Sequence, residues 1–192
     1  MDYPQLRFER FSVRHEIPKS FDCDDKSLND FIKTVEVRKF EEDFLGRTTL
    51  TFLDNRFVGY YTISNNVVQL KEYDQSKDDS VFGQLPVADL PAILIGRLAV
   101  DKPMWKRGIG SLMIGEVARY GCGCAGHCAI RLVIVHAMER PVAFYKKNGF
   151  RFMPESETES KRNEGKSTRM MYMDLKPLII KSRSGDQPRP GN

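Results

Sequence analysis

The stretch RLAVDKPMWKRGIGSLMIGEVARYG, from Arg97 to Gly121, decides the fold of this chain. A β-branched apolar run leads into a loop with the basic pair Lys106-Arg107, and Gly108 and Gly110 then open a segment with helical spacing. The N–H groups at a helix start are unpaired and carry partial positive charge. A phosphate or pyrophosphate is therefore the natural ligand of this turn. A tight strand-to-helix turn without a ligand is the alternative, and the local pattern leaves both interpretations open.

Length and composition place the chain among ordinary globular proteins. Its 192 residues are 41% hydrophobic and 29% charged, and the net charge of +4 permits a nucleic-acid or acidic partner without requiring one. No apolar run approaches the ~20 residues that span a bilayer, and the N-terminal MDYPQLRFERF lacks the apolar segment of a secretory signal. We expect a cytoplasmic protein without a membrane span. Residues 1–178 are predicted to form one domain, and the polar residues 179–192 a flexible tail.

The remaining patterns predict alternating strands and helices in the order β-α-β-β-loop-β-α-β-α-β-β. This order indicates an α/β fold with a mixed sheet and one strand–helix–strand crossover. The predicted strands are 7–16, 48–53, 57–64, 92–100, 130–135, 149–154 and 168–175, the helices are 28–46, 108–120 and 139–149, and the long loop is 71–89.

Two helices carry specific predictions about caps and core positions. Ser27 is the expected N-cap of the first helix, and Gly46 marks its end. Its predicted apolar stripe is Leu28, Phe31, Ile32 and Val35, and the predicted core positions of the second helix are Leu112, Met113, Val117 and Tyr120.

Two nucleotide-binding motifs are excluded. No string matches the P-loop pattern G-x-x-x-x-G-K-[ST]. The dinucleotide pattern G-x-G-x-x-G occurs at GCGCAG, Gly121 to Gly126, but it follows a predicted helix and precedes a strand. We interpret that string as a glycine-rich loop.

The string RLAVDKPMWKRGIGSLM resembles the acyl-CoA-binding motif [QR]-x-x-G-x-[GA] of the GCN5-related N-acetyltransferases (GNAT). AFYKKNGF, Ala143 to Phe150, resembles their later F-Y-x-x-x-G-F helix, and RLVIVHA fits the strand between the two motifs. The resemblance covers roughly Arg7 to Leu175. It implies a GNAT-like mixed central sheet flanked by helices, with acyl-CoA bound between two splayed parallel strands.

The segments FDCDDKSLNDFI, FVGYYTIS and VHAMERPVAFYKKNGF resemble the acetyltransferase toxins of bacterial toxin–antitoxin modules. That group acetylates the amino group of aminoacyl-tRNA and is silenced by a small DNA-binding antitoxin. The resemblance thus implies acetyl-CoA as donor, an amine acceptor of which aminoacyl-tRNA is one candidate, and an antitoxin partner. A homodimer, another acceptor on a protein or small molecule, and a non-catalytic acyl-CoA-binding regulatory domain remain open.

The resemblance also implies the site residues. Pantetheine would pair with the backbone of the strand end, and pyrophosphate would lie on the amides of the turn. Trp105 departs from the motif, because Gln or Arg normally stands there, so Lys106 and Arg107 carry more of the charge recognition. The implied cofactor-binding residues are Leu98, Ala99, Val100, Lys106, Arg107, Gly108, Ile109, Gly110 and Ser111.

Tyr145 is the candidate general acid, because it matches the family tyrosine and a phenol can protonate a thiolate leaving group. A tyrosine half in the core is the alternative role, and Phe144 and Ala143 are expected to pack beside the cofactor. Asp101, His136 and Glu139 lie near strand ends, and no general base is assigned among them.

Three cysteines and a histidine cluster in CGCAGHC, Cys122 to Cys128. Thiolates and imidazole bind zinc, but the C-x-C spacing is cramped and the second C-x-x-C half is missing. We expect reduced thiols and no metal.

Overall fold

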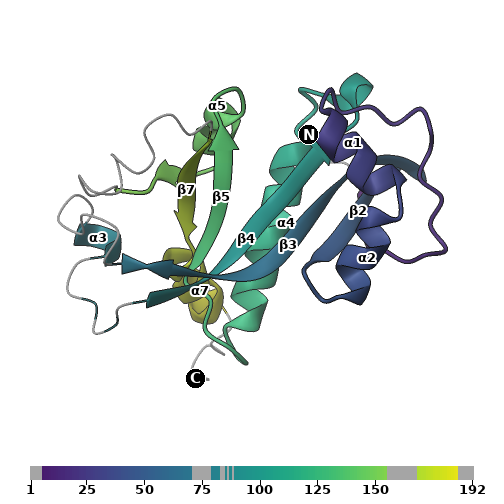
Figure 1. The fold of residues 1–192 in the computed structure, drawn as a ribbon. Coiled ribbons are helices and arrows are strands. Elements are labelled where there is room, and N and C mark those ends of the chain that lie inside the picture. Colours follow the sequence, from purple (N-terminus) through teal and green to yellow (C-terminus); the bar gives the residue numbers. More distant parts are fainter. Residues whose placement is uncertain are drawn as a thin grey trace, which may run out of the picture. The chain divides into compact units, whose positions relative to one another are not determined.

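The structure is a computed structural model that describes residues 6–70, 79–82, 85, 87, 89–154 and 168–185 (Figure 1). It divides into two compact units. Unit 1 is formed by Met1–Ser64 and Ile95–Glu116, and unit 2 by Asn65–Leu94 and Val117–Asn192. The strands β3 and β4 and the helix α4 contribute to both units.

Unit 1 is built on antiparallel strands. β1 (Leu6–Arg10) pairs with β2 (Arg47–Leu53), and β2 pairs with β3 (Arg56–Gln69). Asp54 and Asn55 join β2 to β3 with φ values of 50° and 61°, the left-handed geometry that tight hairpin turns require. The predicted strands 48–53 and 57–64 are confirmed and form a hairpin, and β3 runs beyond its predicted end at Ser64.

The predicted helix 28–46 is wrong as one element. The structure has α1 (Lys26–Lys33) and α2 (Glu36–Glu42), because the backbone of Thr34 is extended between them. Asp25, not Ser27, is the N-cap of α1, since its carboxylate accepts a hydrogen bond from the N–H of Leu28 at 3.0 Å.

The apolar stripe of that helix is confirmed in part. Phe31 and Ile32 are each 1% exposed in the core of unit 1, whereas Val35 is exposed because the chain breaks there. α2 contacts β2, as Figure 1 shows.

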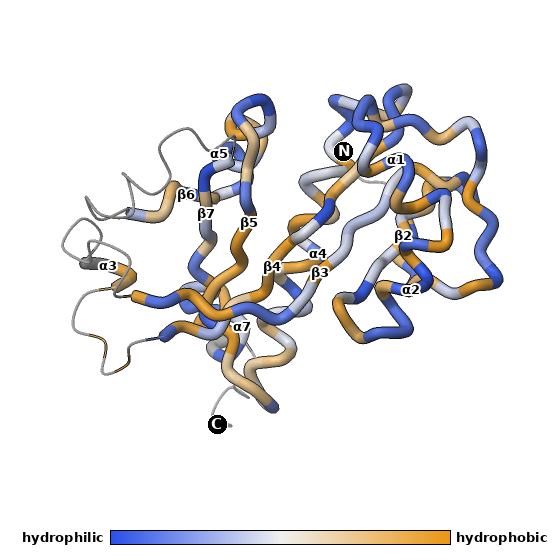
Figure 2. The backbone as a smooth tube through the Cα atoms, viewed as in Figure 1, coloured by the Kyte–Doolittle hydropathy of each residue, from blue (hydrophilic) through white to orange (hydrophobic). Residues whose placement is uncertain are grey.

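Unit 2 contains the parallel pair of the sheet. Ala92 to Leu94 of β4 (Asp89–Val100) pair in parallel with Leu132 to Ile134 of β5 (Leu132–Met138). β7 (Thr168–Asp174) pairs antiparallel with β5 on one side and with β6 (Arg151–Phe152) on the other. The strand order β1-β2-β3-β4-β5-β7-β6 confirms the predicted mixed sheet. Figure 2 shows the apolar character of β4 and β5.

α4 (Ile109–Cys124) is longer than predicted. The interpretation of Gly121 to Gly126 as a glycine-rich loop is wrong for the first four residues, because Gly121 to Cys124 are helical. Met113 and Val117 are fully buried as predicted, but Leu112 and Tyr120 are exposed. The buried face is completed by Ile109, Ile114 and Ala118, because the helix turns a slightly different stripe inward.

The C-terminal part of the described chain differs from the prediction. A helix, α7 (Lys176–Gly185), covers the first residues of the predicted flexible tail 179–192. A carboxylate oxygen of Asp174 accepts from the N–H of Lys176 at 3.0 Å, which satisfies an otherwise unpaired donor at the helix start. Residues 186–192 lie outside the described residues.

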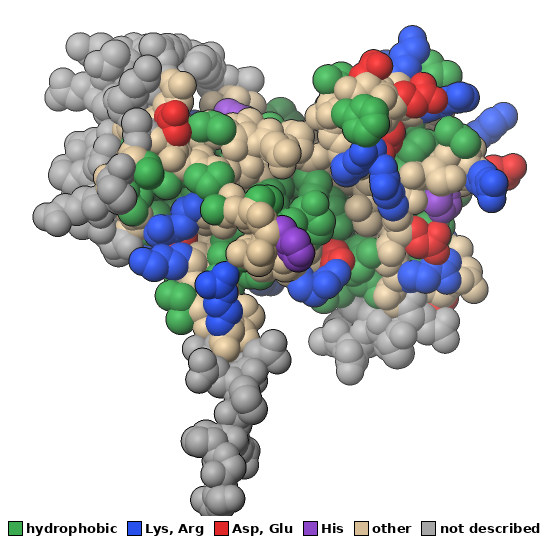
Figure 3. Space-filling model, turned by 90° about the horizontal axis from the view of Figure 1, so that it is seen from below, with side chains coloured by type: hydrophobic (Ala, Val, Ile, Leu, Met, Phe, Trp, Pro, Cys, Tyr) green, Lys and Arg blue, Asp and Glu red, His purple; other side chains and the backbone are tan. Residues whose placement is uncertain are grey.

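Most of the predicted loop 71–89 also lies outside the described residues, apart from the short helix α3 (Asp79–Phe82) and the start of β4. No helix in the described ranges is long and apolar enough to cross a membrane. On the face drawn in Figure 3, basic, acidic and apolar side chains are interspersed.

Candidate functional site

The turn that the sequence singled out lies in unit 1, between β4 and α4. After Val100 the chain passes through Asp101 and a short 3-10 helix, η3 (Lys102–Met104), before α4 begins at Ile109. Met104 is buried within the turn, and Ile109 is buried at the point where the turn meets α4. We call Asp101 to Gly108 the acyl-CoA loop, after the ligand that the family resemblance implies for it.

The exposed part of the acyl-CoA loop uses left-handed backbone at two positions. Lys106 has a φ of 61° and Gly108 a φ of 84°. A Cβ built on Gly108 would meet no atom within 4 Å, so the space in front of this residue is open. Lys106 and Arg107 are exposed beside it. An anion can therefore approach the backbone N–H groups of the helix start with two cations at the rim.

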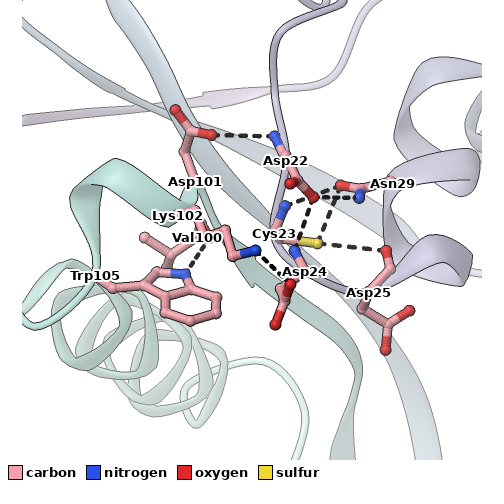
Figure 4. Close-up of polar contacts among 9 residues, drawn as sticks. All are labelled: Asp22, Cys23, Asp24, Asp25, Asn29, Val100, Asp101, Lys102 and Trp105. Carbon is pink, nitrogen blue, oxygen red and sulfur yellow. Dashed lines mark hydrogen bonds and ion pairs between the residues drawn. The ribbon is translucent and has the colours of Figure 1, made fainter.

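Trp105, which departs from the family motif, has a defined role in the loop. Its indole N–H donates a hydrogen bond of 2.7 Å to the backbone carbonyl of Val100. The side chain thus links the loop back to the end of β4, as Figure 4 shows. This bond occupies one lone pair of the Val100 carbonyl, an acceptor of the predicted pantetheine-binding strand.

The predicted strand segment Leu98 to Val100 lies against a glycine that sequence analysis missed. A Cβ on Gly59 of β3 would be 2.4 Å from the carbonyl oxygen of Ala99 and 3.2 Å from the Cα of Val100. Only glycine permits this approach of the two backbones. A glycine inside the β-rich run FVGYY is the signal that could have revealed it.

Asp101 is a second residue whose role the sequence did not reveal. It is 5% exposed, and its carboxylate accepts from the backbone N–H of Asp22 at 3.1 Å and from the Arg56 guanidinium at 3.1 Å. Its own N–H donates to the carbonyl of Val58. The two other residues near strand ends, His136 and Glu139, are exposed and belong to unit 2.

Tyr145 lies in unit 2, on α5 (Val142–Lys147), which contacts β5. The helix ends at Lys147, two residues before the predicted end at Gly149, and Gly149 takes the left-handed φ of 86° that stops it. The N–H of Phe150 donates to the carbonyl of Tyr145, and the N–H of Gly149 to that of Lys146. This pair of bonds is the Schellman motif, which brings the residue after the glycine onto the residue five positions earlier.

The Schellman motif explains why the tyrosine and the second phenylalanine occur together in FYKKNGF. The rings of Tyr145 and Phe150 lie edge to face with centroids 5.4 Å apart, and Phe144 lies against the same tyrosine at 5.2 Å. Burial among these rings raises the pKa of Tyr145 to about 12, so the phenol stays protonated at neutral pH. Among the described residues, none accepts a hydrogen bond from its hydroxyl. Phe144 is half-buried and Ala143 is exposed, and their packing beside the cofactor stays a prediction.

The cysteine cluster lies at the end of α4 and just beyond it. Cys122 and Cys124 are half-buried, Cys128 is exposed, and all four cysteines of the chain are free thiols. Within the described ranges, no three His, Cys, Asp or Glu side chains lie together as metal ligands would.

Comparison with known proteins places this geometry in a family. The sequence profile of the acetyltransferase (GNAT) domain matches residues 54–152, more than half of the chain. The chain is 27% identical to the tRNA-acetylating toxin of Mycobacterium tuberculosis (strain ATCC 25618 / H37Rv) over 136 residues, which cover 70% of this chain and 78% of the toxin.

Solved structures share the fold. AtaT in complex with acetyl-methionyl-tRNAfMet superposes with a TM-score of 0.73 at 20% identity, covering 92% of this chain and 99% of that one. A tyrosine-to-phenylalanine variant of KacT gives a TM-score of 0.75 at 22% identity, covering 92% and 98%. With the family profile matched across the acyl-CoA loop and the tyrosine helix, the chain belongs to the GNAT acetyltransferase family.

Proposed function

We propose that this protein transfers the acetyl group of acetyl-CoA to the amino group of an aminoacyl-tRNA, and that it acts as the toxin of a toxin–antitoxin pair. The observation that carries the proposal is the open turn at Gly108 in a chain of the GNAT family. The relatives support the acceptor and the partner. One is named a tRNA-acetylating toxin, and AtaT has been solved with an acetylated tRNA and, in complex with AtaR, with acetyl-CoA.

The pyrophosphate of acetyl-CoA would bind the backbone amides of Arg107, Gly108, Ile109, Gly110 and Ser111. The side chains of Lys106 and Arg107 would neutralise its charge. Among the described residues, the parallel pairing of β4 with β5 ends at Leu94. The backbone of Leu98, Ala99 and Val100 would then bind pantetheine as an added strand does, apart from the Val100 carbonyl lone pair that Trp105 occupies.

When bound, acetyl-CoA supplies an activated thioester. The acceptor nitrogen would form a bond to the acetyl carbon while the carbon–sulfur bond breaks and the nitrogen loses a proton. Tyr145 would donate its phenolic proton to the sulfur that leaves. Its raised pKa means that the phenol still carries its proton at neutral pH, so the proton is available for transfer to the sulfur.

The role of Tyr145 as a general acid predicts how the reaction rate depends on pH. A general acid works only while protonated, and a group is protonated below its pKa. Because the pKa is about 12, the rate should not fall through loss of this proton between pH 7 and pH 10. A fall near the ordinary tyrosine pKa would mean that Tyr145 is more hydrated than the structure indicates.

Replacing Tyr145 with Phe tests the proposed chemistry. The substitution removes the hydroxyl and keeps the ring between Phe144 and Phe150, so folding and acetyl-CoA affinity should be retained. Turnover should fall by ~10²–10⁴-fold, the usual worth of one general acid. Tyr120→Phe is the matched control, because Tyr120 is 52% exposed on α4. Equal turnover in both variants would reduce Tyr145 to a packing residue.

The acceptor is tested by supplying charged tRNA, polyamines and ribosomal proteins side by side with labelled acetyl-CoA. The proposal expects acetylation of charged tRNA and growth arrest on expression that Tyr145→Phe relieves. Preference for another amine would establish a GNAT enzyme of different purpose. Binding of acetyl-CoA without transfer to any amine would establish a non-catalytic domain.

The proposed partner is a small DNA-binding antitoxin. An AtaT variant has been solved with the C-terminus of the antitoxin AtaR, and KacTA has been solved with DNA. The proposal includes a cytoplasmic location, where aminoacyl-tRNA is found, and a homodimer, which light scattering tests.

A further inference from the structure

The acyl-CoA loop is bridged to a turn far away in the sequence. The N–H of Asp22 donates to the Asp101 carboxylate at 3.1 Å, and the N–H of Lys102 donates back to the carbonyl of Asp22 at 2.8 Å. The two segments are 79 residues apart and both belong to unit 1. Two hydrogen bonds thus join the two segments, and in one of them the buried Asp101 carboxylate is the acceptor in place of a backbone carbonyl.

The segment on the far side of the bridge, Asp22 to Asp25, is itself tightly held. The Asp22 carboxylate accepts from the N–H of Asp24 at 2.9 Å and from the Asn29 amide at 2.8 Å. These donors lower the pKa of Asp22 from its ordinary value, so it is ionised at neutral pH. The Asn29 oxygen accepts in turn from the N–H of Cys23 at 3.0 Å. Figure 4 shows these groups converging on one turn, which we call the anchor turn.

An ion pair adds a second connection. The Lys102 ammonium lies 2.5 Å from a carboxylate oxygen of Asp24, which lies within the anchor turn and has a φ of 63°. Asp25 then caps α1, so the anchor turn is continuous with a helix whose Phe31 and Ile32 are fully buried. The acyl-CoA loop is thereby attached to the core of unit 1 by contacts outside its own strand and helix.

The position of the bridge matters for ligand binding. Asp101 directly follows the predicted pantetheine-binding residues and opens the loop that carries Lys106 and Gly108. A backbone cradle binds an anion well only when its N–H groups are fixed before the ligand arrives. If the loop were released from the anchor turn, its N–H groups would have to be ordered when the ligand binds, and the affinity would fall.

We propose that Asp101 is a positioning residue for acetyl-CoA, acting through the anchor turn Asp22 to Asp25; this inference rests on the proposed function. Asp101 does not touch the ligand in this mechanism. It fixes the start of the acyl-CoA loop, and the Lys102–Asp24 ion pair supports it.

The test measures acetyl-CoA affinity by calorimetry and KM and kcat with any working acceptor. Asp101→Ala should weaken affinity and raise KM by about 10–100-fold, the cost of a small misplacement, while kcat at saturation changes little. Asp101→Asn keeps an oxygen that can accept from Asp22 and should recover most of the affinity. Gly108→Asp puts a carboxylate in the proposed pyrophosphate site and serves as the reference for complete loss of acetyl-CoA binding.

Asp24→Asn separates positioning from simple electrostatics. Asn tolerates the left-handed backbone at this position, so the fold should be retained. Removing a negative charge near an anion site would strengthen binding by Coulomb attraction, whereas loss of positioning weakens it. We expect affinity to fall about threefold, on the scale of one exposed ion pair. This variant also decides the matter if Asp101→Ala does not fold.

Asp174→Asn is the matched control, because this aspartate also binds an arginine and a backbone N–H, but in unit 2. It should leave acetyl-CoA affinity unchanged. Equal loss in Asp101→Ala and Asp174→Asn, or stronger binding in Asp24→Asn, would overturn the positioning role while leaving the proposed function intact. A wild-type protein that does not bind acetyl-CoA, or a Gly108→Asp variant that binds as wild type does, would overturn both.

Discussion

Each unit contains an aspartate–arginine pair, and the two pairs differ in depth. In unit 2, Arg131 binds Asp174 through two hydrogen bonds of 2.7 and 3.2 Å, and both side chains are at least four-fifths buried. Arg131 also donates to the carbonyl of Val81 in α3. In unit 1, Arg56 reaches Asp101 with a single bond, and the arginine side chain is 60% exposed.

The closest glycine contacts differ in the same way. In unit 1, a Cβ on Gly59 would collide with the backbone oxygen of Ala99 at 2.4 Å. In unit 2, a Cβ on Gly121 would meet the methyl group of Leu175 at 2.6 Å, which can rotate away. The closest contact at Gly59 in unit 1 is thus with the backbone, whereas the closest contact at Gly121 in unit 2 is with a side chain that can move. The backbone contact lies at Ala99 and Val100, directly before the acyl-CoA loop.

The largest effect should come from Arg131→Met. The substitution keeps an apolar stem but leaves Asp174 buried without its cation and the Val81 carbonyl without its donor. Breaking a buried pair from one side should lower the free energy of unfolding by about 3–4 kcal/mol. Urea titration followed by circular dichroism measures it. A loss below about 1 kcal/mol, typical of exposed pairs, would remove the difference between the units.

Gly59→Ala should have the next largest effect. The new methyl group must push two backbones apart, and overpacking of this kind costs about 1–3 kcal/mol. Gly121→Ala is its control. Its clash is with a flexible side chain, and alanine favours the helix by up to about 1 kcal/mol, so its net change should be near zero. Similar losses in both variants would show that the backbone contact at Gly59 is not special.

Arg56→Met should have the smallest effect. Because the arginine is mostly exposed, we expect a loss below about 1 kcal/mol that disappears in 1 M salt. Asp101 keeps its bond from Asp22, so acetyl-CoA affinity should stay within about twofold of wild type at this energy scale. A larger loss of affinity would assign the positioning of the loop to the arginine rather than to the anchor turn.

The sequence predicted the parts of the fold that depend on local pattern. The adjacent strands 48–53 and 57–64, the buried strands β4 and β5 and the helix that stops just before Gly149 follow from β-formers, apolar runs and a glycine. The family resemblance predicted the acyl-CoA loop and the tyrosine. Their proposed roles in binding and catalysis remain predictions.

The missed features depend on contacts between distant segments. In the sequence, Asp101 is simply the residue that follows a predicted strand. Only the fold brings the N–H of Asp22 to its carboxylate. The break at Thr34 and the start of α7 were missed for a similar reason. At Thr34 the apolar pattern runs on past the break in the backbone, and after Asp174 the polar composition indicates a tail although a contact of Asp174 with Lys176 supports a helix start.

Trp105 has a further, optical consequence. It is the sole tryptophan among the 192 residues, and its indole N–H is bonded to the strand end at Val100. Indole emission depends on that hydrogen bond and on nearby solvent, so tryptophan fluorescence, excited selectively over that of the seven tyrosines, reports on the acyl-CoA loop. Stopped-flow mixing with a CoA thioester would then follow the arrival of the ligand in real time, without a label and before any bond is made or broken.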